Sequence, residues 1–276
     1  MTTECFEANR RMLEEVYAAY DDPSYVHPDP LEHVLLCENM HDAEVTGLIA
    51  SSFAYGRVQA ILSVTSRILD RMDRRPFEYL SNSGRSDMAH DFSDLKYRFT
   101  TGEETVNFLV GVKMALEEYG SLRDCFESFA SKGGGTYAEA ALSFSERIRS
   151  YSGTGRTSLL PVSGSDSPCK RLMLFLRWMV RKDNVDPGWW EGLDRSRLIV
   201  PLDTHMMSIG RGLGLTGRKN ASMKTAMEIT ASFARFCPED PVKYDFCLTR
   251  SGIRGDDFMG EFREKWIGNG KKSEIS

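Results

Sequence analysis

The chain has 276 residues, of which 41% are hydrophobic and 27% charged, and its formal net charge is −5. This composition is ordinary for one large or two small folded domains, and it excludes a disordered chain. No apolar run approaches the roughly 18 residues of a membrane span, and the N-terminal segment has no signal-peptide core. Six scattered cysteines without a Cys-x-x-Cys pair indicate reduced thiols in a cytoplasmic protein.

Hydrophobic residues recur at helical spacing along most of the chain, so the sequence predicts an all-α fold. The helices expected in the first half span residues 5–20, 41–72, 101–120 and 136–151. The second of them contains a predicted break at Tyr55-Gly56. The third begins at a threonine cap followed by acidic residues and ends at Gly120, which is the usual composition of helix termini.

A linker rich in serine, glycine and proline (152–168) separates these helices from the second half. The helix expected at 169–183 is apolar on almost every side, which predicts a position in the centre of a domain. A connector with two tryptophans follows it, and further helices are expected at 220–236, 242–252 and 256–268. We expect two helical lobes, 1–160 and 161–276, that form one intertwined unit.

Charge is unevenly distributed along the chain. The segment from Ser163 to Arg254 contains 15 Lys and Arg against 10 Asp and Glu, although the whole chain is acidic. A basic segment in an acidic chain indicates an anionic partner such as DNA, whereas a solvated helical surface produces the same asymmetry without a partner.

Lys170 occupies an unusual position for a lysine. Ser167 is expected to cap its helix and Pro168 to be the first helical residue, which places Lys170 in the first turn. The helix dipole and the neighbouring Arg171 both disfavour an ammonium there and favour a neutral, nucleophilic amine. The alternative is a lysine that extends into solvent or binds a phosphate.

Asp203 follows an extended apolar segment and is expected to cap the next helix, where an ionised carboxylate is favourable. A plain cap is the alternative to a catalytic role, and His205 in the same turn is more often a packed residue than a catalyst. The glycine-rich basic segment "GRGLGLTGRK" (210–219) resembles the turn of a helix-turn-helix, which presents N–H groups and cations to phosphates.

Three segments together resemble the helix-hairpin-helix DNA glycosylase superfamily. They are "SPCKRLMLFLRWMV", "IVPLDTHMMSIGRGLGL" and "PEDPVKYDFCLTRSGI", and "TGLIASSFAYGRVQAI" (46–61) resembles an early helix–loop–helix more distantly. The chain is similar to bacterial proteins distantly related to archaeal 8-oxoguanine DNA glycosylase. The resemblance is good over residues 160–255 and weaker before them.

The resemblance implies two helical lobes with a cleft between them, and a base-excision glycosylase with AP lyase activity on an oxidised purine. Lys170 matches the nucleophile that forms a Schiff base, and Asp203 matches the catalytic carboxylate. The implied partner is double-stranded DNA with a damaged base, bound by a monomer associated with the cytoplasmic nucleoid, without a membrane. No metal or other cofactor is expected, since the cysteine-rich tail that holds an iron–sulfur cluster in some relatives is missing.

A flipped base needs a pocket, and DNA needs phosphate contacts. The candidate pocket residues are aromatic: Phe175, Trp178, Trp189, Trp190 and Trp266. The candidate DNA contacts are Ser163, Gly164, Ser165, Ser167, Arg171, His205, Arg211, Arg218 and Lys219. The segment "SGSDSP" stands where the superfamily has a glycine-rich hairpin, which is the main departure from its pattern.

Two other interpretations remain open at this point. The chain could be a helical DNA-binding protein that has lost catalysis, although such a protein has no need of an amine at a helix N-terminus. It could also be an HD-type metal phosphohydrolase that uses His27, His33 and the His41-Asp42 pair. Asp42 is equally suited to capping the helix that follows it.

Overall fold

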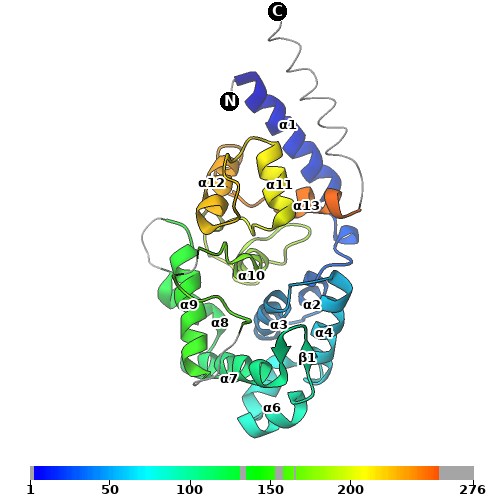
Figure 1. Ribbon diagram of the computed structural model, residues 1–276, viewed down its shortest axis with the longest axis vertical. Helices are drawn as coiled ribbons and strands as arrows, with labels where there is room; N and C mark the ends of the chain where they lie inside the picture. Colours follow the sequence, from blue (N-terminus) through cyan, green and yellow to red (C-terminus); the bar gives the residue numbers. More distant parts are fainter. Residues whose placement is uncertain (1–2, 131–134, 153–157, 165, 255–276) are drawn as a thin grey trace, which may run out of the picture.

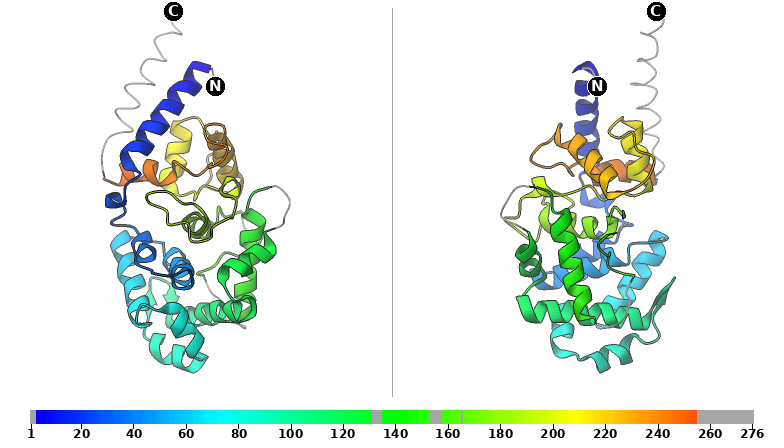
Figure 2. Two further views of the ribbon diagram at one scale, coloured as in Figure 1. Left: turned by 180° about the vertical axis from the view of Figure 1, so that it is seen from behind. Right: turned by 60° about the vertical axis from the view of Figure 1, so that its left-hand side comes forward.

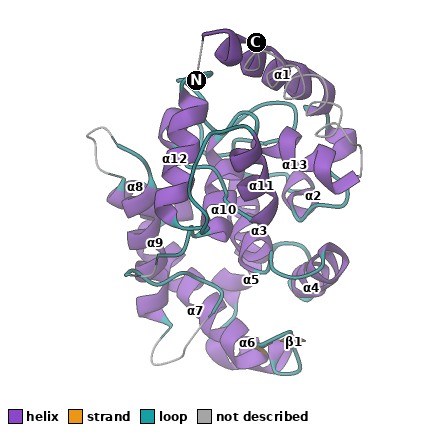
Figure 3. Ribbon diagram, turned by 45° about the horizontal axis from the view of Figure 1, so that its top comes forward, coloured by secondary structure: helices purple, strands orange, loops and turns teal. Residues whose placement is uncertain are grey.

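A computed structural model describes residues 3–130, 135–152, 158–164 and 166–254 of the chain (Figure 1). The described residues are mainly helical, which confirms the predicted all-α class, and the two strands form only a short hairpin (Figure 3). The α-helices are α1 (Thr3–Tyr20), α2 (Leu31–Leu35), α3 (Met40–Ser52), α4 (Val58–Asp70), α5 (Pro76–Asn82), α6 (Arg85–Phe92), α7 (Gly102–Tyr119), α8 (Leu122–Phe129), α9 (Ala138–Tyr151), α10 (Lys170–Val180), α11 (Thr204–Gly212), α12 (Met223–Ala234) and α13 (Asp245–Arg254). None of the described helices is both long and apolar enough to cross a membrane.

Helix boundaries follow the capping residues in the sequence. Thr101 and Glu104 form a capping box at the start of α7, and Gly120 ends that helix with a φ of 83°. The predicted break at Tyr55-Gly56 is confirmed, because α3 ends at Ser52 and α4 begins at Val58. The helix expected at 256–268 lies outside the described residues.

The start of α10 differs from the expectation. Cys169, not Ser167, is the N-cap residue, and Lys170 is the first helical residue. Cys169 has a left-handed φ of 48°, a conformation that is costly for a residue with a side chain. The Ser167 hydroxyl accepts a hydrogen bond from Cys169 N at 3.2 Å and so stabilises the turn before the helix.

Helix α10 lies between two groups of helices, as its apolar sequence predicted (Figures 1 and 2). Helices α1, α11, α12 and α13 lie at one end of the molecule and α4–α7 at the other. Helix α3 packs directly on α10, and Gly47 permits this close approach, because a Cβ there would lie 2.9 Å from Met179 Cε. Helix α1 packs on α13, so the two ends of the described chain share one buried core.

The two strands β1 (Lys96–Tyr97) and β2 (Thr100–Thr101) form an antiparallel hairpin that immediately precedes α7 in the chain. Tyr97 pairs with Thr100, so only Arg98 and Phe99 form the turn. Arg98 has a φ of 54°, which suits the tight two-residue connection. Two 3₁₀ turns, Pro23–Tyr25 and Arg195–Arg197, complete the described elements.

Candidate functional site

The N-termini of α10 and α11 bring Lys170 and Asp203 together. Lys170 Nζ lies 3.0 Å from Asp203 Oδ2, which confirms the expectation that the two side chains meet. Asp203 Oδ1 accepts a hydrogen bond from Met206 N at 2.8 Å, so the carboxylate also caps α11. The lysine side chain is 36% exposed and the aspartate side chain 23%, so a ligand can reach both.

The surroundings of Asp203 keep its carboxylate ionised. Burial alone would raise its pKa, but the charge of Lys170 and the Met206 N–H together hold the pKa below its usual value. The same residue therefore serves as a helix cap and as a fixed negative charge beside an amine. The capping and catalytic interpretations of Asp203 do not exclude each other.

A pocket of about 340 Å³ opens beside this ion pair. Its volume lies in the range of small-ligand sites, roughly 300–1,000 Å³. The turn before α2, the α3–α4 loop, α4, α10, the segment before α11, α11 and α13 all contribute to its wall. Its polar lining comprises Asp29, Lys170, Arg177, Asp203, His205, Asp245, Thr249 and Arg250.

Arg177 and Asp245 form the charged floor of the pocket. The Arg177 guanidinium donates to Asp245 Oδ2 and, at 3.2 Å, to Asp186 Oδ1. Asp245 Oδ1 is buried and has no hydrogen-bond partner in the described part of the chain. Burial raises the pKa of Asp245 to about 6, although Arg177 opposes the shift. Asp245 thus holds a buried acceptor oxygen without a described partner in the wall of the pocket.

Sequence reasoning missed both of these residues. The signal for Arg177 was an arginine inside the apolar run "LMLFLRWMV", where a buried cation needs carboxylate partners. No comparable signal was present for Asp245, because an aspartate at the start of a helix is normally a surface residue. The position of Asp245 in the pocket wall follows from the packing of α13 against α1 and α11.

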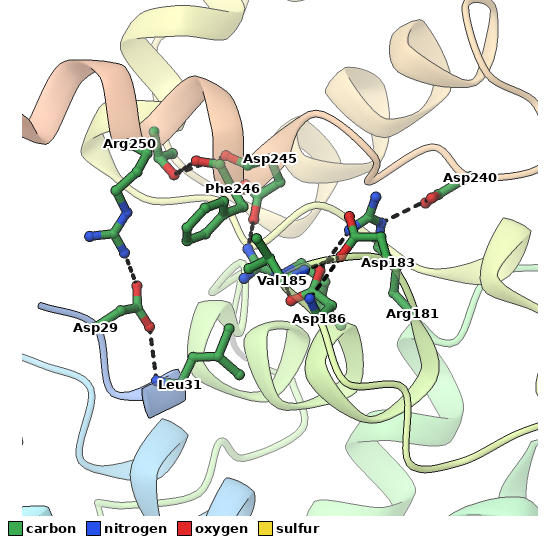
Figure 4. A network of polar contacts seen from close by, with 12 residues as sticks. Asp29, Leu31, Arg181, Asp183, Val185, Asp186, Asp240, Asp245, Phe246 and Arg250 are labelled. Carbon is green, nitrogen blue, oxygen red and sulfur yellow. Dashed lines mark hydrogen bonds and ion pairs between the residues drawn. The ribbon is translucent and has the colours of Figure 1, made fainter. Parts of the chain in front are cut away.

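A network of ion pairs connects the elements that form and adjoin the pocket wall (Figure 4). Arg181 donates to Asp183, to Asp186 at 2.8 Å and to Asp240 at 2.9 Å. At the other end of α13, Arg250 pairs with Asp29, whose Oδ1 accepts from Leu31 N at 3.0 Å (Figure 4). These contacts join the end of α10 to the loop after it and to the segment before α13, and they join α13 to the start of α2. The pocket wall is therefore braced by charge as well as by apolar packing.

The predicted aromatic pocket is wrong for the residues that can be described. Phe175, Trp178 and Trp190 are fully buried in the core and do not line the pocket. Phe175 stacks on Phe144, and Trp190 Nε1 donates to Glu44 Oε2 at 3.1 Å. Because α10 is surrounded by other helices, its aromatic side chains fill the core. Trp189 packs against the same core without lining the pocket, and Trp266 lies outside the described residues.

Most of the predicted DNA contacts are exposed, and one of them, His205, lines the pocket. Ser163, Gly164 and Ser167 are exposed before α10, and Ser165 lies outside the described residues. Asp166 O accepts from Met223 N at 3.3 Å, which joins this segment to the start of α12. His205, Arg211, Arg218 and Lys219 are exposed as well, and Arg218 forms a surface ion pair with Glu228.

The expectation for Arg171 requires correction. Its guanidinium donates to the carbonyl oxygens of Ser52, at 2.5 Å, and Ser158, at 2.7 Å. It also lies over the Tyr55 ring, 5.3 Å from the centroid. Both Nη groups thus satisfy backbone carbonyls, and Arg171 braces α10 against the end of α3 instead of facing a DNA phosphate.

The histidines behind the phosphohydrolase interpretation are separated in the structure. His27 pairs with Glu32 at 2.8 Å, His33 is buried, and His41 stacks on Phe77. Asp42 accepts from Asn39 Nδ2 and Phe77 N, which is a structural role. Throughout the residues that can be described, no three His, Cys, Asp or Glu side chains are arranged to hold a metal ion.

The fold and the site thus define a mainly helical protein with an amine–carboxylate pair at the edge of a charged pocket. A family match covers residues 29–254, and the chain belongs to this family, DUF2400, which is described as a protein family of unknown function. The matched segment contains Lys170, Asp203 and every residue of the pocket floor. Comparisons with curated proteins and with solved structures gave no match.

Proposed function

We propose that this protein is a base-excision DNA glycosylase with AP lyase activity. The observation that carries the proposal is the 3.0 Å contact between Lys170 Nζ and Asp203 Oδ2 at the edge of the 340 Å³ pocket. The proposed fold is the helix-hairpin-helix glycosylase type, with the pocket in a cleft between two helical lobes. The proposed substrate is a damaged base, an oxidised purine, in double-stranded DNA, bound by a monomer at the cytoplasmic nucleoid.

The pair supplies the two groups that this reaction needs. The neutral Lys170 amine attacks C1′ of the damaged nucleotide, the C1′–N bond breaks, and the base leaves with the bonding electrons and takes up a proton. Opening of the sugar ring then gives an imine between Nζ and C1′. Loss of a proton from C2′ expels the 3′-phosphate and cleaves the strand. The ionised Asp203 stabilises the positive charge that develops on the sugar.

The resting ion pair implies that a proton must move when substrate binds. Asp203 has a lowered pKa and is therefore a weak base while Lys170 is next to it. A bound nucleotide excludes water and places the departing base near the amine, so that this base is the better acceptor for the proton. Asp203 then acts mainly through its charge and by positioning the amine.

The surface around the site suits a duplex. The segment before α10 and residues 205–219 include exposed hydroxyl groups and cations, and His205 lines the pocket itself. Such groups bind phosphates without reading the base sequence. The binding constant should therefore fall steeply with salt concentration, since each phosphate contact releases counterions.

Borohydride trapping on a panel of lesion-containing duplexes tests this function. The wild-type chain should form a covalent adduct with at least one lesion, and Lys170→Ala should form none while it still binds the duplex. Asp203→Asn keeps the cap and should change the free energy of unfolding by about 1 kcal/mol or less. It should slow excision about 10²- to 10³-fold. Salt-sensitive binding without an adduct on any lesion would favour a DNA-binding protein without catalysis.

A further inference from the structure

The β1–β2 hairpin presents an aromatic ring to solvent beside the pocket. Phe99, in the two-residue turn, has a side chain that is 70% exposed, which is unusual for a residue of this size. One face of its ring stacks on Tyr55, with the centroids 5.7 Å apart and the planes inclined by 9°. The cation of Arg98 lies 5.3 Å from the same ring, so an aromatic and a cation project together.

Hydrogen bonds fix this hairpin to the α3–α4 loop. Tyr55 Oη lies 2.6 Å from Thr100 Oγ1, and the Tyr97 hydroxyl donates to the carbonyl of Tyr55. The Arg98 side chain covers Gly56, where a Cβ would lie 2.8 Å from Nη1 and where φ is 104°. The exposed ring is therefore carried by a connected support and not by a loose loop.

The same support reaches the catalytic lysine. Arg171, the neighbour of Lys170, lies over Tyr55 and donates to the carbonyl of Ser52 at the end of α3. Ala54, Gly56 and Val58 belong to the pocket wall. One chain of contacts thus sets the position of Phe99 relative to the lysine at the pocket edge.

We infer that Phe99 enters the base stack of duplex DNA and fills the gap left when a nucleotide turns toward Lys170. Extrusion of a nucleotide unstacks its two neighbours at a cost in free energy, and an aromatic ring inserted between them recovers part of it. Insertion exchanges the contact of the ring with Tyr55 for a contact with a base on each of its faces. Lys96, in β1, and Arg57, at the start of α4, are exposed cations on the elements that carry or support this ring.

This inference rests on the proposed function, because it needs a duplex with one nucleotide in the pocket. An RNA strand or a protein partner could also cover an exposed phenylalanine. Binding of either of these partners through Phe99 would not depend on a missing base in a DNA duplex, so their predicted outcomes differ from that of insertion. The binding experiment therefore uses a duplex that lacks one base, and an undamaged duplex of the same sequence is the reference.

The experiment measures binding of the full chain to a duplex that carries a tetrahydrofuran abasic analogue, with 2-aminopurine next to the gap. The wild type should prefer this duplex to the undamaged one and should quench or shift the 2-aminopurine signal. Phe99→Ala should lower that preference about tenfold, the size expected for one lost stacking contact, and leave binding to undamaged duplex unchanged. Phe99→Trp should retain the preference.

Leu36→Ala is the matched control, because Leu36 is 69% exposed at the end of α2 and lies outside the pocket wall. This variant should bind both duplexes as the wild type does. Any one of three results would overturn the insertion. The wild type shows no preference for the abasic duplex, Phe99→Ala leaves the preference unchanged, or Leu36→Ala loses it equally. If Phe99→Ala lowers the preference but no lesion yields a borohydride adduct, the inserted phenylalanine is supported and the proposed glycosylase chemistry fails. If a lesion yields an adduct but Phe99→Ala leaves the preference unchanged, the chemistry is supported and the insertion fails.

Discussion

Two sets of ion pairs lie within a few turns of α10, and they differ in exposure and in chemistry. Lys170 and Asp203 meet at the N-terminal end of the helix with 36% and 23% of their side chains exposed. Arg177 and Arg181, on the following turns, are almost fully buried and bind Asp186, Asp240 and Asp245. The first set is accessible to a ligand, whereas the second is enclosed by the core.

The choice of cation follows this difference. An arginine remains charged and donates in several fixed directions, which suits a buried position with several carboxylates. A lysine can lose its proton and has a nucleophilic amine, which suits a group that must react. Under the proposed function, the buried pairs hold the pocket in shape and the exposed pair carries out the reaction. The following predictions test this division.

Exchanging lysine for arginine at the exposed pair should have the largest effect. Lys170→Arg keeps a positive charge beside Asp203 but has no amine that can form an imine. Borohydride trapping and strand cleavage should fall below detection, while the midpoint of urea unfolding and the salt dependence of DNA binding stay close to those of the wild type. A variant that still yields an adduct would show that Lys170 is an ion-pair partner and not the nucleophile.

Removing a buried cation should instead affect stability. Arg181→Met leaves Asp186 and Asp240 without their shared partner, and a broken buried pair costs about 3–5 kcal/mol. The free energy of unfolding, measured in urea, should fall by this amount. Arg218→Met is the control, because its pair with Glu228 is exposed and should contribute only about 0–1 kcal/mol. Equal losses in the two variants would contradict the structural role of the buried network.

The two regions should respond to pH with opposite signs. The pKa of Asp203 is lowered by folding, so its contribution to stability is present above about pH 4 and is lost as the pH falls further. The pKa of Asp245 is raised to about 6, so the folded chain holds a proton between about pH 4 and 6 that the unfolded chain has released. Its contribution is therefore greatest in acid and declines as the pH rises through 6.

Free energies of unfolding measured between pH 3 and 7 check this prediction, which has the smallest expected effect. Relative to the wild type, Asp203→Asn should lose less stability on acidification below pH 4. Asp245→Asn should gain stability relative to the wild type as the pH rises from 4 to 7, because it resembles the protonated carboxyl group. If both substitutions change the pH dependence of the unfolding free energy in the same direction, the burial assigned to Asp245 is wrong.

Local signals in the sequence were enough for the longer helices and for the positions of Lys170 and Asp203, but the short helices α2, α5, α6 and α8 were not predicted. Lys170 and Asp203 each stand at a helix N-terminus, where a lysine is out of place and an aspartate is expected, and the family resemblance joined the two. The pocket lining depends on which face each helix buries, and this is decided by tertiary packing. Trp178 and Trp190 were therefore assigned to the pocket although they belong to the core, and Asp245, which does line it, gave no signal.

The position of the covalent bond tests the central claim most directly. The wild-type chain is reduced with borohydride on the lesion that gives the highest yield, the DNA is digested, and the modified peptide is mapped by mass spectrometry. The account predicts a deoxyribose-derived remnant on Nζ of Lys170 and on no other lysine. A remnant on another amine would show that the 3.0 Å contact with Asp203 is a structural ion pair.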